Sequence, residues 1–279
     1  MARRTFLPLP RHALSSLPVV GVVVLAKLGF ELADATPLKP NPLLSGVVAA
    51  TVFLIGFLLA GTVADYKESE RLPGDIAAAL DTIADECLIV HATPGSPAAA
   101  QGLALLRDIA NAIDGWVHRR HDIEHVLGLI RRLNEPFAAF TPITLPGFVA
   151  RLKSEQASLR RMVLRIDTIR STSFVAAGYT ITEMTGALLM LGLVLSDLGG
   201  MGESVFFTGM IALLLTYMVL LVRDLDDPFR YDSGVEGAAD VSLAPLRAVA
   251  ERLDRELAGL TGKAPAAPSP PSPPGQPAR

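Results

Sequence analysis

The sequence predicts an all-α membrane protein with four transmembrane helices in two hairpins and a cytoplasmic helical bundle. Half of its 279 residues are hydrophobic, and a mean hydropathy of +0.40 exceeds that of a typical soluble α/β enzyme. The apolar residues cluster into segments long enough to span a bilayer, and the polar stretches have helical periodicity without strand alternation. The predicted spans are Ala13–Leu32, Leu43–Val63, Phe174–Leu195 and Ser204–Val222.

Composition narrows the classes of function. The net charge of −3 and the lack of a basic aromatic patch argue against a nucleic-acid partner. The single cysteine, Cys87, excludes an intramolecular disulfide framework, and we expect it to be a small core residue. The sequence has no nucleophile elbow, no phosphate-binding glycine loop and no His-Glu-x-x-His motif. We therefore expect neither enzymatic activity nor a cofactor.

The first span contains two charged residues. Residues 1–16 resemble the n-region of a signal peptide, but the apolar run after them contains Lys27 and Glu31 and is followed by no clear cleavage site. We therefore expect a retained membrane helix. Lys27 and Glu31 lie one helical turn apart, so they either pair on one face or extend to the outer interface. An ion-binding role is the third interpretation, because charges within a membrane are costly.

The basic residues near the span ends predict the orientation. Lysine and arginine accumulate on the cytoplasmic side, and the two short turns, Ala33–Pro42 and Ser196–Glu203, contain only one basic residue, Lys39. Both termini and the middle region are therefore expected to be cytoplasmic, in a multi-pass protein of the plasma (inner) membrane. The residues that carry this prediction are Arg3, Arg4, Arg11, Lys67, Arg71, Arg165, Arg170, Arg223 and Arg230.

These assignments divide the chain into six parts. The parts are a cytoplasmic N-terminus (1–12), the first hairpin (13–63), a cytoplasmic helical region (64–173), the second hairpin (174–222), a C-terminal segment with an amphipathic helix (223–262), and a disordered proline-rich tail (263–279). Helices are predicted at Asp75–His91, Ser96–Leu133, Gly147–Ser171 and Pro245–Leu260. Pro136, Pro142 and Pro146 are expected to break the chain before the third of these.

The second span changes character abruptly at its end. Gly46–Ala64 carries no charge, and a polar stretch follows before Pro73 and Gly74. An apolar helix that continues into a charged segment is expected where a channel wall meets the cell interior. The charged residues of this predicted pore mouth are Asp65, Lys67, Glu68, Glu70 and Arg71.

Two motifs resemble those of bestrophins, a family of pentameric ion channels. The first has Phe57 at the end of the second helix, Tyr66 and Glu68 in an aromatic-Glu cluster, and Pro73-Gly74 where the family has Trp-Gly. The second is Asp227-Pro228-Phe229 after the fourth span, which is similar to the family's Asp/Asn-Pro-Phe, with a Leu-rich segment at Leu243–Leu246. The chain departs from the family pattern at Leu58, Ala60 and Asp65, so the resemblance is to a diverged bestrophin-like protein.

The resemblance implies a homopentameric channel whose neck is formed by Ala49, Phe53 and Phe57. Their i, i+4, i+8 spacing places all three on one face of a helix. Stacked apolar rings would gate passive ion conduction by dewetting. Chloride is the family's default ion, although the mixed charges of the predicted mouth leave the sign of the permeant ion open. The alternative is that the two phenylalanines face lipid or a neighbouring helix.

Three further sets of charged or titratable residues are candidate sites. The acidic cluster after the fourth span corresponds to the calcium clasp of eukaryotic bestrophins, but Ser233-Gly234-Val235 interrupts it, and solvated carboxylates are the simpler interpretation. Three histidines near Asp114 share one face of the predicted helix, either as a metal or pH-responsive cluster or as a solvated face. Glu183, within the third span, either lines a vestibule or bonds to a neighbouring helix. The acidic cluster is Asp224, Asp226, Asp227 and Asp232, and the histidines are His118, His121 and His125.

The expected partners are the bilayer, inorganic ions and further copies of the chain. A non-conducting scaffold or regulatory protein is the alternative function. In that case the cytoplasmic helices and the proline-rich tail would bind a protein partner, because such tails dock in aromatic grooves.

Overall fold

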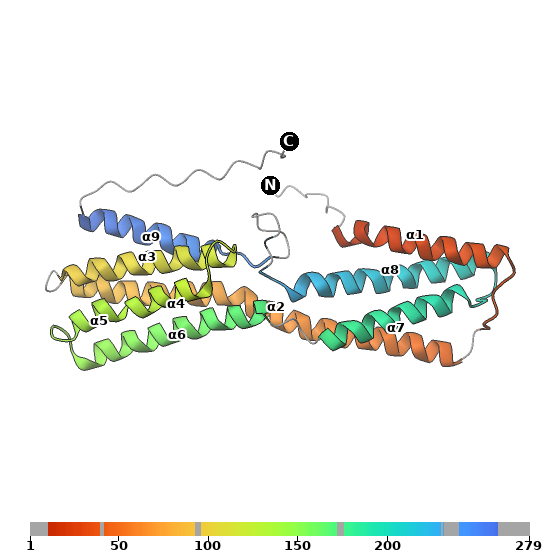
Figure 1. The fold of residues 1–279 in the computed structure, drawn as a ribbon, viewed down its shortest axis with the longest axis horizontal. Helices are drawn as coiled ribbons and strands as arrows, with labels where there is room; N and C mark the ends of the chain where they lie inside the picture. Colours follow the sequence, from red (N-terminus) through yellow and green to blue (C-terminus); the bar gives the residue numbers. More distant parts are fainter. Residues whose placement is uncertain are drawn as a thin grey trace, which may run out of the picture. The chain divides into compact units, whose positions relative to one another are not determined.

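The computed structural model describes residues 11–39, 42–92, 96–171, 176–229, 231 and 240–261. These residues form helices and turns, and no β-strand occurs among them, so the predicted all-α class is confirmed (Figure 1). The predicted N-terminal segment 1–12, apart from the backbone of residues 11 and 12, and the tail 263–279 lie outside the described residues. The helices are α1 (Arg11–Leu32), α2 (Pro42–Ala92), α3 (Pro97–Val117), α4 (Ile123–Arg132), α5 (Asn134–Phe140), α6 (Pro146–Ser171), α7 (Ala176–Val194), α8 (Met201–Asp226) and α9 (Ala244–Thr261).

The chain divides into two compact units. The first unit comprises the described residues of Met1–Ser69, Ile169–Arg230 and Gly237–Asp240, and the second unit comprises those of Glu70–Thr168, Tyr231–Glu236 and Val241–Arg279. Helix α2 contributes its first part to one unit and its second part to the other. The predicted cytoplasmic location of the middle region stays a prediction.

The first unit consists of α1, the first part of α2, α7 and α8. Helix α1 packs along α8 and α7, and a small apolar core joins α2 to α7 and α8 through Ile55, Leu189, Leu193 and Leu215. Helices α1, α2 and α8 are long and apolar enough to cross a membrane, as expected for a multi-pass membrane protein. The described side chains of α7 form a shorter apolar helix, Gly178–Val194, so the predicted number of four spans is not confirmed.

The two short turns of the first unit are hydrogen-bonded to each other. The amide of Leu38 donates to the carbonyl of Leu195 over 3.1 Å, and the amide of Asp197 donates back to the carbonyl of Leu38 over 2.8 Å. Asp34 and Gly199 have positive φ angles of 49° and 115°, which let the chain reverse direction sharply. These bonds satisfy backbone groups that the helix ends leave without an intrahelical partner.

The second unit is a helical bundle built from the second part of α2 and from α3, α4, α5, α6 and α9. Helix α3 packs against α9, α4 and α5. Cys87 is fully buried, in agreement with the predicted core role, and lies against Gly102. The fully buried apolar side chains include Ile76, Leu80, Ile83, Leu103, Leu106, Ile109, Ile113, Ile130, Phe140, Leu159, Val163, Ile166, Leu246 and Leu253.

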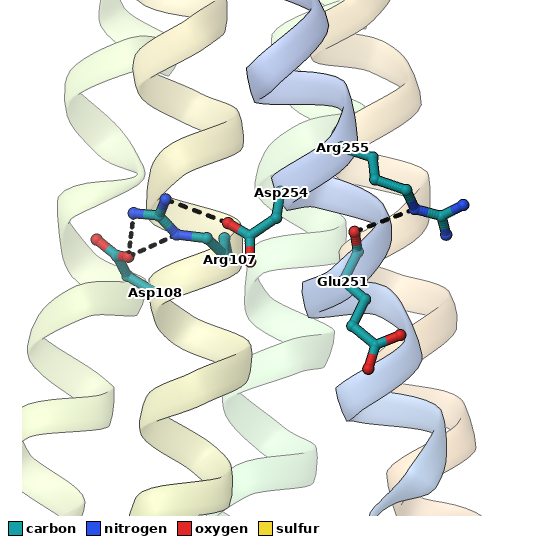
Figure 2. A network of polar contacts seen from close by, with 5 residues as sticks. All are labelled: Arg107, Asp108, Glu251, Asp254 and Arg255. Atoms are coloured by element: carbon teal, nitrogen blue, oxygen red, sulfur yellow. Dashed lines mark hydrogen bonds and ion pairs between the residues drawn. The ribbon is translucent and has the colours of Figure 1, made fainter. Parts of the chain in front are cut away.

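An exposed polar network joins α3 to α9 in this bundle (Figure 2). Arg107 donates to Asp108 over 2.7 Å and reaches Asp254 on α9 at 3.4 Å. Asp108 is the main cause of a raised pKa of the Arg107 guanidinium. On α9 itself, Arg255 donates to the backbone carbonyl of Glu251 over 3.3 Å. These polar contacts lie on the exposed surface of the bundle and are not part of its buried apolar core.

Two predicted helix boundaries are wrong. The helix expected at Asp75–His91 is the end of α2, which runs through Pro73 without a break. Proline removes one backbone donor, but the helix is kept because Leu72, Pro73 and Ile76 are buried in the second unit. Tertiary packing therefore overrides the local signal at Pro73-Gly74.

The predicted helix Ser96–Leu133 is in fact two helices, α3 and α4. The chain turns at His118–Asp122, where Arg119 has a positive φ of 59° and the amide of Arg120 donates to the carbonyl of Gly115 over 2.7 Å. Gly115 is required there, because a Cβ atom at this position would overlap the ring of His121. A further short helix, α5, was not predicted, because Pro136 lies in its first turn instead of breaking the chain. The predicted helices Gly147–Ser171 and Pro245–Leu260 correspond to α6 and α9 within one residue.

Candidate functional site

The membrane part of α2 has a buried face and an uncovered face. Thr51, Ile55, Leu58 and Thr62 are buried, and Ile55 packs against leucines of α7 and α8. Phe53 and Phe57 have exposed fractions of 76% and 68%, and Ala49 is exposed as well. At about 100° per residue the two sets lie on nearly opposite sides of the helix. The first unit therefore leaves the predicted neck residues together on one face that no other described part of this unit covers.

The threonine hydroxyls on the buried face of α2 form their hydrogen bonds within the helix. The hydroxyl of Thr51 donates to the carbonyl of Val47 over 2.8 Å, and the hydroxyl of Thr62 donates to that of Leu58 over 3.1 Å. Because both hydroxyls bond one turn back, this face packs as an apolar surface. Helix α2 is thus held in a fixed rotation about its own axis by Ile55 and Leu58.

The predicted mouth residues follow on the same helix. Lys67, Glu68, Glu70 and Arg71 are exposed, and Asp65 is half-buried. The hydroxyl of Ser69 donates to the carbonyl of Asp65 over 2.9 Å, so this buried polar group has a partner within the helix. Asp65, Lys67 and Glu68 belong to the first unit, whereas Glu70 and Arg71 belong to the second. Charges of both signs therefore follow the apolar part of α2 directly.

Lys27 and Glu31 pair within α1. The Lys27 Nζ atom lies 2.7 Å from the Glu31 Oε1 atom and also donates to the backbone carbonyl of Ser196 in the turn between α7 and α8. The lysine side chain has no exposed surface. The first of the alternatives for these residues, pairing on one face, is the one the structure shows. The ammonium group connects α1 to the α7–α8 turn.

Glu183 bonds to a neighbouring helix, the second of its two alternatives. Its carboxylate accepts a hydrogen bond from the guanidinium of Arg223 near the end of α8. The ion pair borders a cavity of about 280 Å³ inside the first unit. In the sequence, Arg223 predicts only the orientation of the chain. Its charge at the end of the fourth span is the one feature that could have indicated an ion pair with Glu183.

The Asp227-Pro228-Phe229 motif directly follows α8. Pro228 and Phe229 are buried, so this motif anchors the chain where the helix ends. Asp224, Asp226 and Asp227 are half-buried, and Asp232 lies outside the described residues. Among the residues that the structure describes, no group of three or more histidine, cysteine or acidic side chains is placed to hold a metal ion.

The three histidines do not share one helical face, which corrects the prediction. His118 caps the end of α3, His121 lies in the turn, and His125 lies in α4, because the chain reverses between them. His118 stacks on Tyr231 with ring centroids 4.5 Å apart, and the rings of His121 and His125 are 5.1 Å apart. The Asp114 carboxylate accepts a hydrogen bond from Arg120 over 2.6 Å and also lies 3.6 Å from the Nδ1 atom of His118.

Neither a protein-family model nor a curated protein sequence matches this chain. Solved structures of a bacterial bestrophin homolog from Klebsiella pneumoniae are similar to it. A single-substitution variant has a TM-score of 0.67 at 15% identity, with 91% of this chain and 98% of that chain covered. The structure phased with zinc has a TM-score of 0.65 at 16% identity, covering 92% and 100%, and a second variant has 0.67 at 15%, covering 89% and 99%. The chain therefore has the bestrophin fold, and the predicted resemblance is confirmed at that level.

Proposed function

We propose that this chain assembles into a homo-oligomeric ion channel whose pore is lined by α2. The observation that carries the proposal is the uncovered face of Ala49, Phe53 and Phe57, opposite the face of α2 that packs on α7 and α8. The bestrophin fold supports it, because the sequence resemblance implies the same three residues as the neck of a pentamer.

The neck would act by controlling hydration. Copies of α2 around an axis would stack the exposed rings of Phe53 and Phe57 into narrow apolar constrictions, with Ala49 forming the widest ring. Water is unstable in a narrow apolar tube, and an ion cannot cross without water or a polar substitute. The polar stretch that follows on α2 would then face the cell interior, with both termini on that side. Anion conduction, with chloride as the family default, is the selectivity that we propose.

A flux assay in liposomes tests the proposal. Purified wild-type protein should conduct ions above the background of empty liposomes, and Phe53→Ala combined with Phe57→Ala should raise the flux, because two apolar constrictions are removed. The matched control is Phe206→Ala with Phe207→Ala on α8, where both rings are also exposed. This control should leave the flux unchanged, and reversal potentials under a salt gradient report the sign of the ion.

Two results would contradict the proposal. One is background flux for the wild type and for the α2 double variant alike, which would favour the alternative of a non-conducting scaffold. The other is a monomer or dimer in mild detergent, because neither has a central axis around which α2 forms a ring.

A further inference from the structure

The cavity within the first unit has apolar walls and a charged rim. It lies between α1, α2, α7 and α8, and its apolar lining includes Val19, Ile55, Ala187, Met190 and Leu215. Its volume of about 280 Å³ is too small for a whole lipid molecule but has room for part of one acyl chain. Gly186 also lines it, and a Cβ atom built there would meet nothing within 4 Å. The space is therefore open at the level of this glycine.

Two hydroxyl groups in the cavity wall lack partners. Thr182 has an exposed fraction of 2%, and neither its oxygen nor that of Thr216 makes a hydrogen bond among the described residues. Thr51, Thr62 and Thr185 of the same unit all donate to the carbonyl one turn back. Both oxygens have almost no accessible surface, and the hydroxyl of Thr208 in the same unit is unpaired as well although Thr208 does not line the cavity. The hydroxyls of Thr182 and Thr216 are therefore buried within the wall and do not contact a ligand in the cavity.

The rim of the cavity offers one charge of each sign. The Glu183 and Arg223 side chains have exposed fractions of 43% and 56%, so both remain accessible while they contact each other. Arg223 lies three residues before the last residue of α8, and Glu183 lies about 10 Å along α7 from its first residue. Arg223 is therefore near the end of an apolar helix, where lipid headgroups lie, and it contacts Glu183, which lies farther from the end of its own helix.

We propose that this cavity binds one membrane phospholipid with a zwitterionic headgroup that carries a primary ammonium. Part of one acyl chain occupies the apolar space. The phosphate pairs with Arg223, and the ammonium pairs with Glu183. The two charges of the headgroup match the two charges of the rim. The inference does not depend on ion conduction.

Filling the cavity tests the proposal directly. Gly186→Leu places a side chain in the open space, and Gly29→Leu on α1 is the matched control, because a Cβ atom there also meets nothing within 4 Å and Gly29 does not line the cavity. Delipidated protein in detergent is titrated with dioleoyl phosphatidylethanolamine, and native mass spectrometry counts the bound lipids. We expect one tightly bound lipid per chain for the wild type and for Gly29→Leu, and binding at least about tenfold weaker for Gly186→Leu.

Equal lipid binding by all three proteins would overturn the proposal. It would also be overturned if Gly186→Leu changed the oligomeric state but not the lipid count, because the cavity would then be an interface between copies. Since the assay measures bound lipid, its result is independent of whether the protein conducts.

The headgroup is tested with Glu183→Gln, which keeps an acceptor for Arg223 and removes the negative charge. The wild type should prefer phosphatidylethanolamine to phosphatidylglycerol, and the variant should lose about fivefold of that preference. Unchanged preference in the variant would overturn the proposed pairing with the ammonium. Tight binding of oleate, equal to that of phosphatidylethanolamine, would likewise overturn the phospholipid as the ligand. A thermal unfolding scan of each variant shows whether it is folded.

Discussion

The two units bury their apolar residues in different ways. In the first unit, large side chains such as Leu25, Leu188 and Phe206 are exposed all around the helices, and the buried core is small. In the second unit, leucine, isoleucine and phenylalanine side chains fill a continuous core, and the outside carries ion pairs. The first unit is therefore suited to lipid and the second to water, because exposed apolar surface is stable in lipid but not in water.

The ion pairs of the two units also differ in how much of each side chain is exposed. Lys27 and Glu31 have side-chain exposures of 0% and 11% within an apolar span, whereas Arg107 and Asp254 have 32% and 47% on the bundle surface. A charge that is buried without its partner is costly, while an exposed charge is compensated by water. Substitutions at the two kinds of ion pair should therefore differ in how much stability they remove.

Removing the buried lysine should have the largest effect. Lys27→Met should destabilise the protein more than either substitution below, because it removes a fully buried ammonium group that contacts Glu31 and the carbonyl of Ser196. Thermal unfolding in detergent measures the loss. The double variant Lys27→Met with Glu31→Met should recover most of it. A single variant as stable as the wild type would mean that this pair is in effect solvated, and the contrast between the units would fail.

Overfilling the core of the second unit should have an intermediate effect. A Cβ atom at Gly102 would lie 2.8 Å from the Cys87 Sγ atom, in the centre of the bundle. Gly102→Ala should therefore cost about 1–3 kcal/mol by overpacking. The control is Gly128→Ala on α4, where nothing lies within 4 Å, and alanine should stabilise the helix by up to about 1 kcal/mol. Stabilisation by both substitutions would show that the core is loosely packed.

Breaking the exposed pair should have the smallest effect. Arg107→Ala, which removes the contacts with Asp108 and Asp254 shown in Figure 2, should cost less than about 1 kcal/mol. The loss should shrink further at high salt, because exposed charges are screened. Unfolding curves at low and high salt measure both effects. A salt-independent loss as large as that of Lys27→Met would contradict the assignment of this pair to an exposed surface.

The elements with strong local signals were predicted well. Long uncharged runs identified the apolar helices, and amphipathic spacing identified α6 and α9 nearly to the residue. The errors occurred where local and tertiary signals disagree. Pro73 does not end α2, because its neighbours are buried, and the turn at His118–Asp122 depends on the fit of the His121 ring over Gly115. Neither packing contact can be read from the spacing of residues along the chain.

The candidate sites also differ in whether spacing along one helix or contacts between helices identify them. Helical spacing alone placed Ala49, Phe53 and Phe57 on one face, and the observed burial of Ile55 on the opposite face agrees with it. The contact of Lys27 with the carbonyl of Ser196 and the ion pair of Glu183 with Arg223 join segments that are distant in the sequence. Periodicity describes one helix at a time, so it gives no information about which side chains of different helices meet.

Three features follow from the sequence alone: the protein is a helical membrane protein, certain of its segments are apolar, and certain residues of the second span share a face. Hydrophobic periodicity is a property of the local chain, so these features need no knowledge of the fold. Three other features require the folded structure: α2 is one long helix, Arg223 contacts Glu183, and a cavity lies beside this ion pair. These features arise from packing between helices, because contacts between distant segments form only when the whole unit is assembled.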